Sequence, residues 1–498
     1  MSNIRVTYSG LISFVVSLVG VFTGIIFTII VTRQLTQEEL GTWGLVGTMT
    51  GYFLIFGPIS TYWITREIAR GTNSGKTGFV TSGLFGLGLV GVYVIFSLLF
   101  QIQVDVEITI LLFASISLPL EYIRSSLQSI TLATRPELRS YGLIIFESTK
   151  IPIGFILIYF LQMGVYGAIL TTVIAASSEI ILLLIKSRKY ISGSFNKKYL
   201  KKWIKLFWIP TYPKISNRIL NLDVVVFSII TGNVTGIAFW TTANAISKIV
   251  SNSGQISISL YGKLLASEKK EYFHENLIKT FYFSIPLVAI AIIFAKPGLF
   301  ILNPIYTSAV NIVIFMSLVV FLRTLDGVFD SALTGIEKVD LKENATFRDY
   351  IRSKLFYIPT LRLIQRSVYL TSVIVIISIL TIFSFSELEL VIYWSMISLF
   401  TQIPFSIYFY ILVRRNFEMK IQKIVLIKYL ISALVSFGSV YVLMEQFLIY
   451  DESIFVFLPN FIPFVIISSI GYFGLTFLID KKTRQLFRLI ISEVRKNN

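Results

Sequence analysis

An apolar stretch at residues 206–231 carries charged side chains that a lipid-facing helix would exclude. It reads LFWIPTYPKISNRILNLDVVVFSIIT and contains Lys214, Arg218 and Asp223. A charge at the centre of a bilayer helix costs about 2.5–3.5 kcal/mol on insertion scales. Lys214 and Arg218 are four residues apart, so they share a helical face and repel each other. Arg offers a planar fork to phosphate oxygens and Lys a mobile point charge. We therefore expect this helix to line a cavity that receives an anionic group.

Each of these charges also has an ordinary structural explanation. Lys214 lies about eight residues into the stretch, so its side chain can snorkel to the cytoplasmic interface. Arg218 lies nearer the middle of the stretch, from which its side chain does not easily reach the interface. On one continuous helix, Asp223 would lie about 180° from Lys214, so we expect it to face a neighbouring helix. Two prolines, Pro210 and Pro213, predict that the helix can bend.

Charges in other apolar stretches fall into pairs that can neutralise each other. Glu121 and Arg124 are three residues apart, and so are Glu147 and Lys150. Residues at this spacing are neighbours on a helix surface. Each pair can therefore be an ion pair that anchors the helices, or part of a polar site.

The remaining charges in apolar stretches are less balanced. Arg323 and Asp326 are three residues apart, and Asp330 extends this stripe with an acid in excess. Glu179 and Lys248 have no opposite charge nearby in their own stretches. The candidate cations for an anionic ligand are thus Lys214, Arg218, Lys248, Arg323, Arg124 and Lys150. The candidate carboxylates for ion coupling or gating are Asp223, Asp326, Asp330, Glu121, Glu147 and Glu179.

The composition predicts an all-α protein with many membrane-spanning helices. The 498 residues are 55% hydrophobic and only 14% charged, with a mean hydropathy of +0.77. Soluble chains carry about 25% charged residues. Basic loops between apolar stretches account for the net charge of +17, so we expect no nucleic-acid partner. The chain has no Cys, and its one His, His274, lies in a polar loop, so we expect no metal centre.

About fourteen stretches are apolar enough to span a bilayer, which takes about 20 residues. They are 9–31, 40–64, 79–100, 108–134, 141–162, 164–185, 206–231, 234–260, 277–300, 307–334, 367–385, 390–413, 424–446 and 456–479. If the N-terminus is inside, the inner segments hold about 36 Lys and Arg residues and the outer ones about two, Arg33 and Lys296. This asymmetry predicts that both termini are cytoplasmic, in a plasma or inner membrane.

A basic linker joins the sixth and seventh predicted spans. From Lys197 to Trp208 it alternates Lys clusters with Tyr, Leu, Trp and Ile. This pattern is typical of an amphipathic helix on an anionic leaflet, and a plain linker with positive-inside charge explains it as well. The predicted organisation is an N-terminal lobe at 1–190, the linker at 191–205, a C-terminal lobe at 206–414, and two helices with a basic cytoplasmic tail at 415–498. Gly41 and Gly236 follow spans one and seven, which fits either a duplicated lobe or chance.

Four segments resemble the polysaccharide-exporting flippases. RQLTQEELGTWGL at 33–45 is similar to their R-x-L-x-x-x-E-x-G-x-(aromatic)-x-L signature, which contributes Arg33, Glu39 and Gly41. ITREIAR at 64–70, with Arg66, resembles the segment after their second span. LDVVVFSIITGNVTGIAF and NPIYTSAVNIVIFMSLVVFLRTLDGVFDSALTGIEK resemble their seventh-to-eighth and ninth-to-tenth regions. The family comprises the O-antigen and related lipid-linked oligosaccharide flippases of the multidrug/oligosaccharidyl-lipid/polysaccharide exporter superfamily.

The resemblance covers residues 9–340 and implies both a fold and an activity. The implied fold has two pseudo-symmetric six-helix lobes around a central cavity, plus two C-terminal helices. The implied activity is the movement of a polyprenyl-diphosphate-linked oligosaccharide from the cytoplasmic to the outer leaflet by alternating access. Cations lining the cavity would receive the diphosphate, and H⁺ or Na⁺ flux or the membrane potential would drive transport. Membrane lipids and glycan-assembly proteins are the other implied partners, and the implied state is a monomer. Arg33 and Arg66 would contact substrate or anchor helix ends at the interface.

Two other classes of protein remain as alternatives. A cation-coupled multidrug exporter of the same superfamily would favour carboxylates and aromatic residues for cationic substrates. A membrane glycan polymerase or ligase would need a large outer loop with Arg or His, and the predicted outer loops are short. The chain also lacks a G-x-x-x-x-G-K-[ST] phosphate loop. We therefore expect a transporter and not an enzyme.

Overall fold

The computed structural model describes residues 20, 22–257, 271–335, 337, 347–417, 423–481 and 483–485. Throughout this part the chain forms helices joined by turns, and it contains no strand there. The chain divides into two compact units. The first contains residues 1–241 and 362–390, and the second contains 242–361 and 391–498. These units divide the chain at other points than the predicted lobes, and the lobe boundaries stay a prediction.

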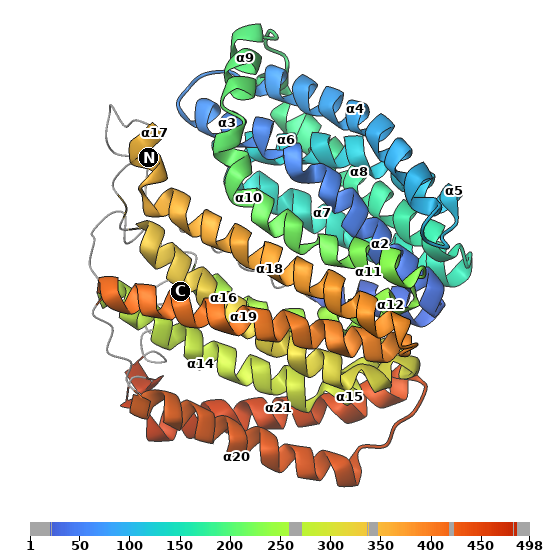
Figure 1. Cartoon of the computed structure of the whole chain (residues 1–498), viewed down its shortest axis with the longest axis vertical. Coiled ribbons are helices and arrows are strands. Elements are labelled where there is room, and N and C mark those ends of the chain that lie inside the picture. The colour runs from blue at the N-terminus through green and yellow to red at the C-terminus, as the bar shows by residue number, and fades with distance from the viewer. Residues whose placement is uncertain are drawn as a thin grey trace. The chain divides into compact units, whose positions relative to one another are not determined.

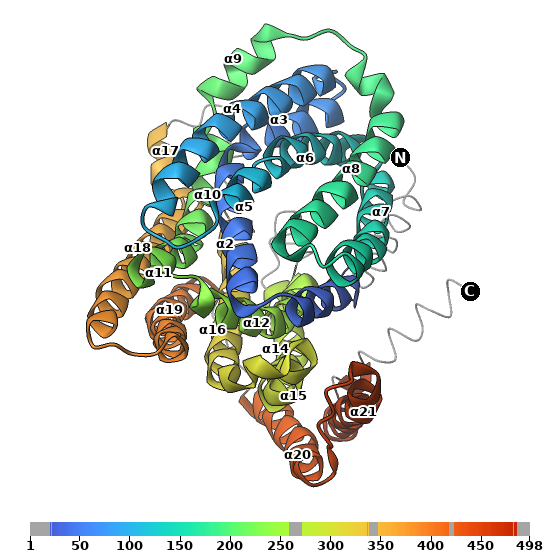
Figure 2. The ribbon, with the colours of Figure 1, turned by 90° about the vertical axis from the view of Figure 1, so that its right-hand side faces the viewer.

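The first unit begins with the helix Phe22–Gln34 and continues through short and long helices (Figure 1). Its elements are α2 (Gln37–Phe53), η1 (Leu54–Phe56), α3 (Pro58–Ala69), α4 (Gly75–Gln101), α5 (Ile108–Ala114), α6 (Ser117–Thr134), α7 (Pro136–Gly154), η2 (Phe155–Phe160), α8 (Gly164–Ile191), α9 (Lys197–Lys205), α10 (Trp208–Leu220) and α11 (Leu222–Thr231). Part of α12 (Thr235–Ser247) and most of α18 (Lys354–Ile382) complete it. The helices α3, α4, α7 and α8 pack around α6, as Figure 2 shows.

The second unit contains the end of α12 and the remaining helices. They are η3 (Lys248–Ser257), α14 (Glu271–Ile293), α15 (Ala295–Leu302), η4 (Pro304–Ala309), α16 (Val310–Gly335), α17 (Phe347–Ile351), α19 (Glu387–Phe417), α20 (Lys423–Phe447) and α21 (Ile454–Ile479). The pair α20 and α21 packs on α14 and α15 (Figure 2). There Tyr472 donates a 2.8 Å hydrogen bond to the Tyr282 carbonyl oxygen. The last two helices are thus fixed to the second unit by buried aromatic side chains.

Ten described helices are long and apolar enough to cross a membrane. They correspond to spans three to six and nine to fourteen of the prediction. The chain is therefore an all-α polytopic membrane protein, which confirms the predicted fold class. The other four predicted spans, 9–31, 40–64, 206–231 and 234–260, are short or interrupted in the described part.

The interruptions have clear causes in the backbone. In the second span, α2 tightens into the 3-10 turn η1, and α3 restarts at Pro58. Proline suits this first helical position because it lacks an N–H and has a fixed φ. In the seventh span, α10 ends at Leu220 and α11 begins at Leu222, with a turn at Asn221. This interruption at Asn221 is separate from Pro210 and Pro213, which lie inside α10, and a bend at the prolines stays a prediction.

Candidate functional site

The interruptions of the second and seventh spans lie beside each other in the first unit. The helix α10 packs against η1 and α3, and α11 packs against α2 (Figure 1). Interrupted helices in a membrane protein expose backbone groups and commonly form binding sites where they line a cavity. This region is therefore the candidate site, and Arg218 is its central charge.

Arg218 projects from the last turn of α10 toward the end of α2. A Cβ atom placed on Gly51 would lie 3.6 Å from Nη1 of Arg218, so the missing side chain leaves room for the guanidinium. Tyr52 and Tyr122 are close enough to interact with Arg218 electrostatically. Tyr122 donates a 2.7 Å hydrogen bond to the Phe53 carbonyl oxygen. This bond occupies a backbone oxygen beside the interruption at η1.

The guanidinium of Arg218 has no ion pair or hydrogen bond with any described residue. It is nevertheless only half-exposed. A partly desolvated cation gains strongly from a charge-assisted hydrogen bond, and Arg can bind a phosphate at two points. Lys214 lies one helical turn earlier on α10, and its side chain is outside the described part of the chain.

Asp223 faces α18, as the sequence predicts. Its Oδ2 accepts a 2.6 Å hydrogen bond from the Tyr369 hydroxyl, and both side chains are buried. The chain turns at Asn221, so the predicted single continuous helix is wrong. Asp223 instead lies in the first turn of α11, where a carboxylate is favoured by the helix dipole.

Arg124 of α6 is held in a network of charged side chains within the first unit. It forms a 3.0 Å ion pair with Glu121 and a 3.6 Å ion pair with Glu179. Glu179 also accepts a 2.6 Å hydrogen bond from Gln128, and the guanidinium lies 4.7 Å from the ring centroid of Phe146. The expected Glu121–Arg124 pair is confirmed, and Glu179 finds its partner on another helix.

Lys150 forms a second network on α7. Its Nζ lies 2.5 Å from Glu147, which also accepts a 2.7 Å hydrogen bond from Thr23. The ammonium lies 5.4 Å and 5.3 Å from the rings of Phe27 and Phe146. This confirms the expected Glu147–Lys150 pair. Both Arg124 and Lys150 thus hold carboxylates in this structure, so an anionic ligand would have to compete for them.

The turn between α11 and α12 is held by several neighbours in the first unit. Gly232 has a φ of 74°, a conformation that glycine adopts without steric cost, and its carbonyl oxygen accepts a 3.1 Å hydrogen bond from the Asp105 N–H. The Asn233 side chain accepts from the Thr235 N–H and donates a 2.7 Å bond to Glu387. The turn is therefore tied to the α4–α5 loop and to the start of α19.

Gly41 of α2 lies directly against this turn. A Cβ atom at Gly41 would lie 1.9 Å from the Val234 carbonyl oxygen, a distance that no real side chain could adopt. One turn along α2, a Cβ at Gly44 would lie 2.5 Å from the Thr241 hydroxyl. These glycines allow α2 to approach α12 closely. Close packing of α2 against the turn therefore explains why the signature position 41 is a glycine.

The other signature residues lie at helix ends. Glu39 and Thr36 form a capping box at the start of α2, with hydrogen bonds of 2.9 and 3.2 Å. Arg33 is half-buried near the end of the helix Phe22–Gln34. Arg66 is exposed, and its guanidinium lies 4.3 Å from the ring centroid of Tyr62. This geometry suits anchoring at the end of a helix, and contact with a substrate stays a prediction.

In the second unit, Gln402 of α19 bridges Arg323 and Asp326 of α16. Arg323 donates a 3.4 Å bond to Gln402 and a 3.2 Å bond to Ser398. Gln402 donates a 2.6 Å bond to Asp326, which also accepts from Ser406 at 2.9 Å. The predicted stripe on α16 is thus satisfied partly by α19. Asp330 is half-buried one turn further along α16.

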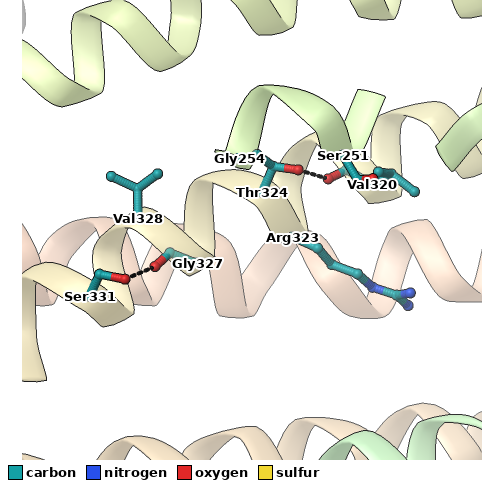
Figure 3. A pocket seen from close by; sticks show the side chains of 8 residues that line it. All are labelled: Ser251, Gly254, Val320, Arg323, Thr324, Gly327, Val328 and Ser331. Atoms are coloured by element: carbon teal, nitrogen blue, oxygen red, sulfur yellow. Dashed lines mark hydrogen bonds between the residues drawn. The ribbon is translucent and has the colours of Figure 1, made fainter. Parts of the chain in front are cut away.

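A cavity of about 400 Å³ lies between η3 and α16. The residues lining it are Ser251, Gly254, Val320, Arg323, Thr324, Gly327, Val328 and Ser331. Figure 3 shows that the Arg323 side chain extends away from Thr324 and Val328. Lys248, at the start of η3, is exposed. Neither Lys248 nor Arg323 belongs to the unit that holds Arg218.

Several residues of these sites were not identified from the sequence. Tyr52, Tyr122, Glu387 and Gln402 come from elements that only the fold brings together. A partial signal was present at Gly57–Pro58 inside the second predicted span, because Gly and Pro together mark an interruption.

Comparison with solved structures identifies the fold. "Lipid II flippase MurJ, inward closed conformation" is 14% identical with a TM-score of 0.65, and the match covers 97% of this chain and 100% of that one. A multidrug resistance MATE family transporter of the MOP superfamily, in an inward-facing conformation, is 12% identical with a TM-score of 0.60, over 80% and 95% of the two chains. An outward-facing structure of such a transporter is 14% identical with a TM-score of 0.57, over 83% and 95%.

No protein-family model matches the sequence, and a search of curated proteins finds no match. This chain therefore has the fold of these solved MATE transporters and of the lipid II flippase. At these identities the likeness establishes the fold alone. The substrate has to be argued from the chain's own residues.

Proposed function

We propose that the chain is a flippase that moves a polyprenyl-diphosphate-linked oligosaccharide from the cytoplasmic to the outer leaflet, for the assembly of a surface glycan. Transport is by alternating access in a plasma or inner membrane, with both termini in the cytoplasm. The observation that carries this proposal is Arg218, a half-buried cation without an ion pair among the described residues, beside two interrupted spans. The similarity of the fold to a lipid II flippase supports the same class.

Arg218 would bind the diphosphate as the substrate enters from the cytoplasmic side. Its planar fork offers two parallel hydrogen bonds to phosphate oxygens, and Lys214 follows the same helix one turn away. The hydroxyl of Tyr52, half-buried beside Gly51, can donate a further bond. The ion pairs of Arg124 and Lys150 then serve to hold the helices, and their carboxylates are the candidates for ion coupling.

A test follows the substrate by leaflet. Cells without the gene should accumulate the lipid-linked glycan on the cytoplasmic side, and the wild-type chain should restore its export. Lys214→Ala/Arg218→Ala should not restore it, although its expression and membrane insertion should match wild type. Rescue by this double variant would contradict the proposal, as would unchanged export in the deletion strain.

The similarity to MATE transporters favours one second candidate, a cation-coupled multidrug exporter. This function predicts resistance to lipophilic cations that is lost when a carboxylate, such as Asp326, is replaced by Asn. A flippase predicts no such resistance. A glycan polymerase or ligase would alter the glycan chemically, so the purified chain is also incubated with lipid-linked glycan and the product is weighed by mass spectrometry.

A further inference from the structure

The short helix α9 has one face docked on the first unit and one face fully exposed. Trp203 is 0% exposed and lies in a core cluster with Trp63 and Ile64. Glu67 of α3 accepts a 3.4 Å hydrogen bond from the Trp203 indole and a 3.0 Å bond from the Lys202 ammonium. The apolar side of this amphipathic helix is therefore bound to protein, whereas the sequence pattern left open both a helix on an anionic leaflet and a plain linker.

The start of α9 is fixed as well. Asn196 caps the helix by accepting a 2.9 Å hydrogen bond from the Lys198 N–H, and its own N–H donates a 2.9 Å bond to the Thr77 hydroxyl of α4. With the Trp203 anchor near its other end, the nine-residue helix has a defined rotation about its axis. The direction in which its remaining side chains point is thus set by the fold.

The outward face of α9 carries four lysines. Lys197, Lys201 and Lys205 follow each other at intervals of four residues, and Lys198 lies beside them. All four are exposed, and none forms an ion pair or a side-chain hydrogen bond with a described residue. Lys202 differs because it points toward Glu67. Like charges at this spacing repel, so an external anion would stabilise the face.

The surroundings of this lysine face indicate what that anion is. No Asp or Glu occurs between Glu179 and Asp223. Ile204 and Phe207, beside the lysines, are 51% and 48% exposed. The helix lies between the spanning helix α8 and α10, with two residues before α10, so it is held close to the bilayer surface. A rigid cationic face flanked by exposed apolar side chains complements anionic lipid headgroups over an acyl layer.

We propose that the lysine face of α9 (Lys197, Lys198, Lys201 and Lys205) binds the anionic headgroups of the cytoplasmic leaflet. Because only Leu206 and Phe207 separate α9 from α10, the bound lipids also fix the start of the helix that carries Arg218. This inference concerns ordinary membrane lipids and does not depend on the transported substrate.

The absence of cysteine allows a direct test. The full chain with Ile204→Cys is labelled with a bimane fluorophore and reconstituted into bilayers of phosphatidylcholine and phosphatidylglycerol, with bromine on the acyl chains of one lipid at a time. Brominated phosphatidylglycerol should quench the label at a mole fraction roughly tenfold below that of brominated phosphatidylcholine, because several lysines act together. Salt at 0.5 M should reduce this preference through screening.

A test variant of the labelled chain replaces the four lysines of this face by Gln and keeps Lys202 and Trp203. It should lose the preference for phosphatidylglycerol while its thermal unfolding midpoint stays that of the wild type. A control replaces four exposed cations elsewhere, Arg414, Arg415, Lys423 and Lys481, and should keep the preference. Equal quenching by the two lipids would overturn the proposal, and so would a preference that survives in the four-lysine variant or that 0.5 M salt leaves unchanged. None of these readings requires transport, so they remain decisive if the proposed function fails.

Discussion

Arg218 differs from the other basic residues of the first unit's spans in what surrounds it. Arg124 and Lys150 each contact a carboxylate at ion-pair distance, which offsets the cost of their burial. Arg218 instead lies beside two tyrosines and a glycine, with no described acid in contact. This difference is the reason why we propose Arg218, and not Arg124 or Lys150, as the residue that receives an incoming anion.

Substitutions can distinguish the two-point hydrogen-bonding geometry of the Arg218 guanidinium from its positive charge. Arg218→Lys keeps the charge and loses the two-point geometry, so we expect a partial loss of transport. Arg218→Ala removes charge-assisted hydrogen bonds worth about 1.5–3 kcal/mol, which corresponds to a loss of roughly tenfold to a hundredfold in apparent affinity. The measurement is the substrate dependence of flipping in proteoliposomes. Arg139→Ala is the control, since Arg139 is exposed and is not a candidate site residue. Equal activity in Arg218→Ala and wild type would contradict a binding role.

Gly41 and Gly47 both lie on α2, so their alanine variants form a matched test and control for close packing. In Gly41→Ala the new methyl group would meet the Val234 carbonyl oxygen at 1.9 Å, so α2 has to move away, at a cost of about 1–3 kcal/mol. Gly47→Ala meets nothing within 4 Å and should stabilise the helix by about 0.5–1 kcal/mol. Thermal unfolding of the purified variants in detergent measures both. Similar unfolding midpoints would show that the approach of α2 to the turn is not tight.

Ion pairs between residues close in sequence could be predicted from the sequence. Contacts between residues that only the fold brings together could not. The ion pairs of Glu121 with Arg124 and of Glu147 with Lys150 follow from a spacing of three residues. The contact of Gln402 with Arg323 and Asp326, or of Glu387 with Asn233, joins residues that are far apart in sequence. Nothing in the local pattern indicates them.

At the scale of elements, hydropathy shows how long an apolar stretch is, but not whether it forms one continuous helix. Residues 206–231 are apolar as a whole, yet α10 and α11 are separate helices. The prolines do not mark this interruption, and Pro210 lies in the first turn of α10, where proline is tolerated. Trp203 is a second example, since an amphipathic pattern shows that a helix has an apolar face and does not show whether lipid or protein covers it.

The turn at Asn221 can be tested as a joint between α10 and α11. Asn221 is exposed, and Ala favours a continuous helix by roughly 0.5–0.7 kcal/mol relative to Asn. Asn221→Ala should therefore slow transport while leaving expression and the unfolding midpoint near wild type. Pro210→Ala is the control and should change transport less, because Pro210 lies in the first turn of α10, where proline is tolerated. If Pro210→Ala had the larger effect, the joint would lie at the prolines as the sequence suggested.

The hydrogen bond between Asp223 and Tyr369 links α11 to α18 inside the first unit. Breaking a buried hydrogen bond to a charged group costs about 1–3 kcal/mol, so Asp223→Asn and Tyr369→Phe should each lower the unfolding midpoint. Their combination should cost less than the sum, with a coupling energy of about 0.5–3 kcal/mol. A double-mutant cycle on thermal unfolding measures it. Strict additivity would show that the 2.6 Å contact contributes no stability.

At the scale of the whole molecule, composition alone was sufficient to predict a polytopic membrane protein. A chain with 14% charged residues and ten long apolar helices in its described part spans a membrane many times, because a bilayer span needs about 20 mostly apolar residues. The division into two compact units was not predicted, because it depends on which helices pack together. The orientation in the membrane stays a prediction from the Lys and Arg count.

Single cysteines in the cysteine-free chain test that orientation. Gln103, after α4, is exposed in a predicted outer loop, and Lys198 is exposed in the predicted inner linker. A membrane-impermeant maleimide added to intact cells should label Gln103→Cys and leave Lys198→Cys unlabelled until the membrane is opened. Labelling of Lys198→Cys in intact cells would invert the topology and place Arg218 in the outer half of its span.

The contact between Gly41 and Val234 has an evolutionary consequence. The atom of Val234 that approaches Gly41 most closely is its carbonyl oxygen, which every amino acid carries. Position 234 can thus exchange one buried apolar side chain for another of similar size without losing this contact, whereas position 41 admits no side chain at all. Among sequences descended from a common ancestor with this chain, variation should be unequal on the two sides of the contact, with residue 41 fixed and residue 234 free to drift.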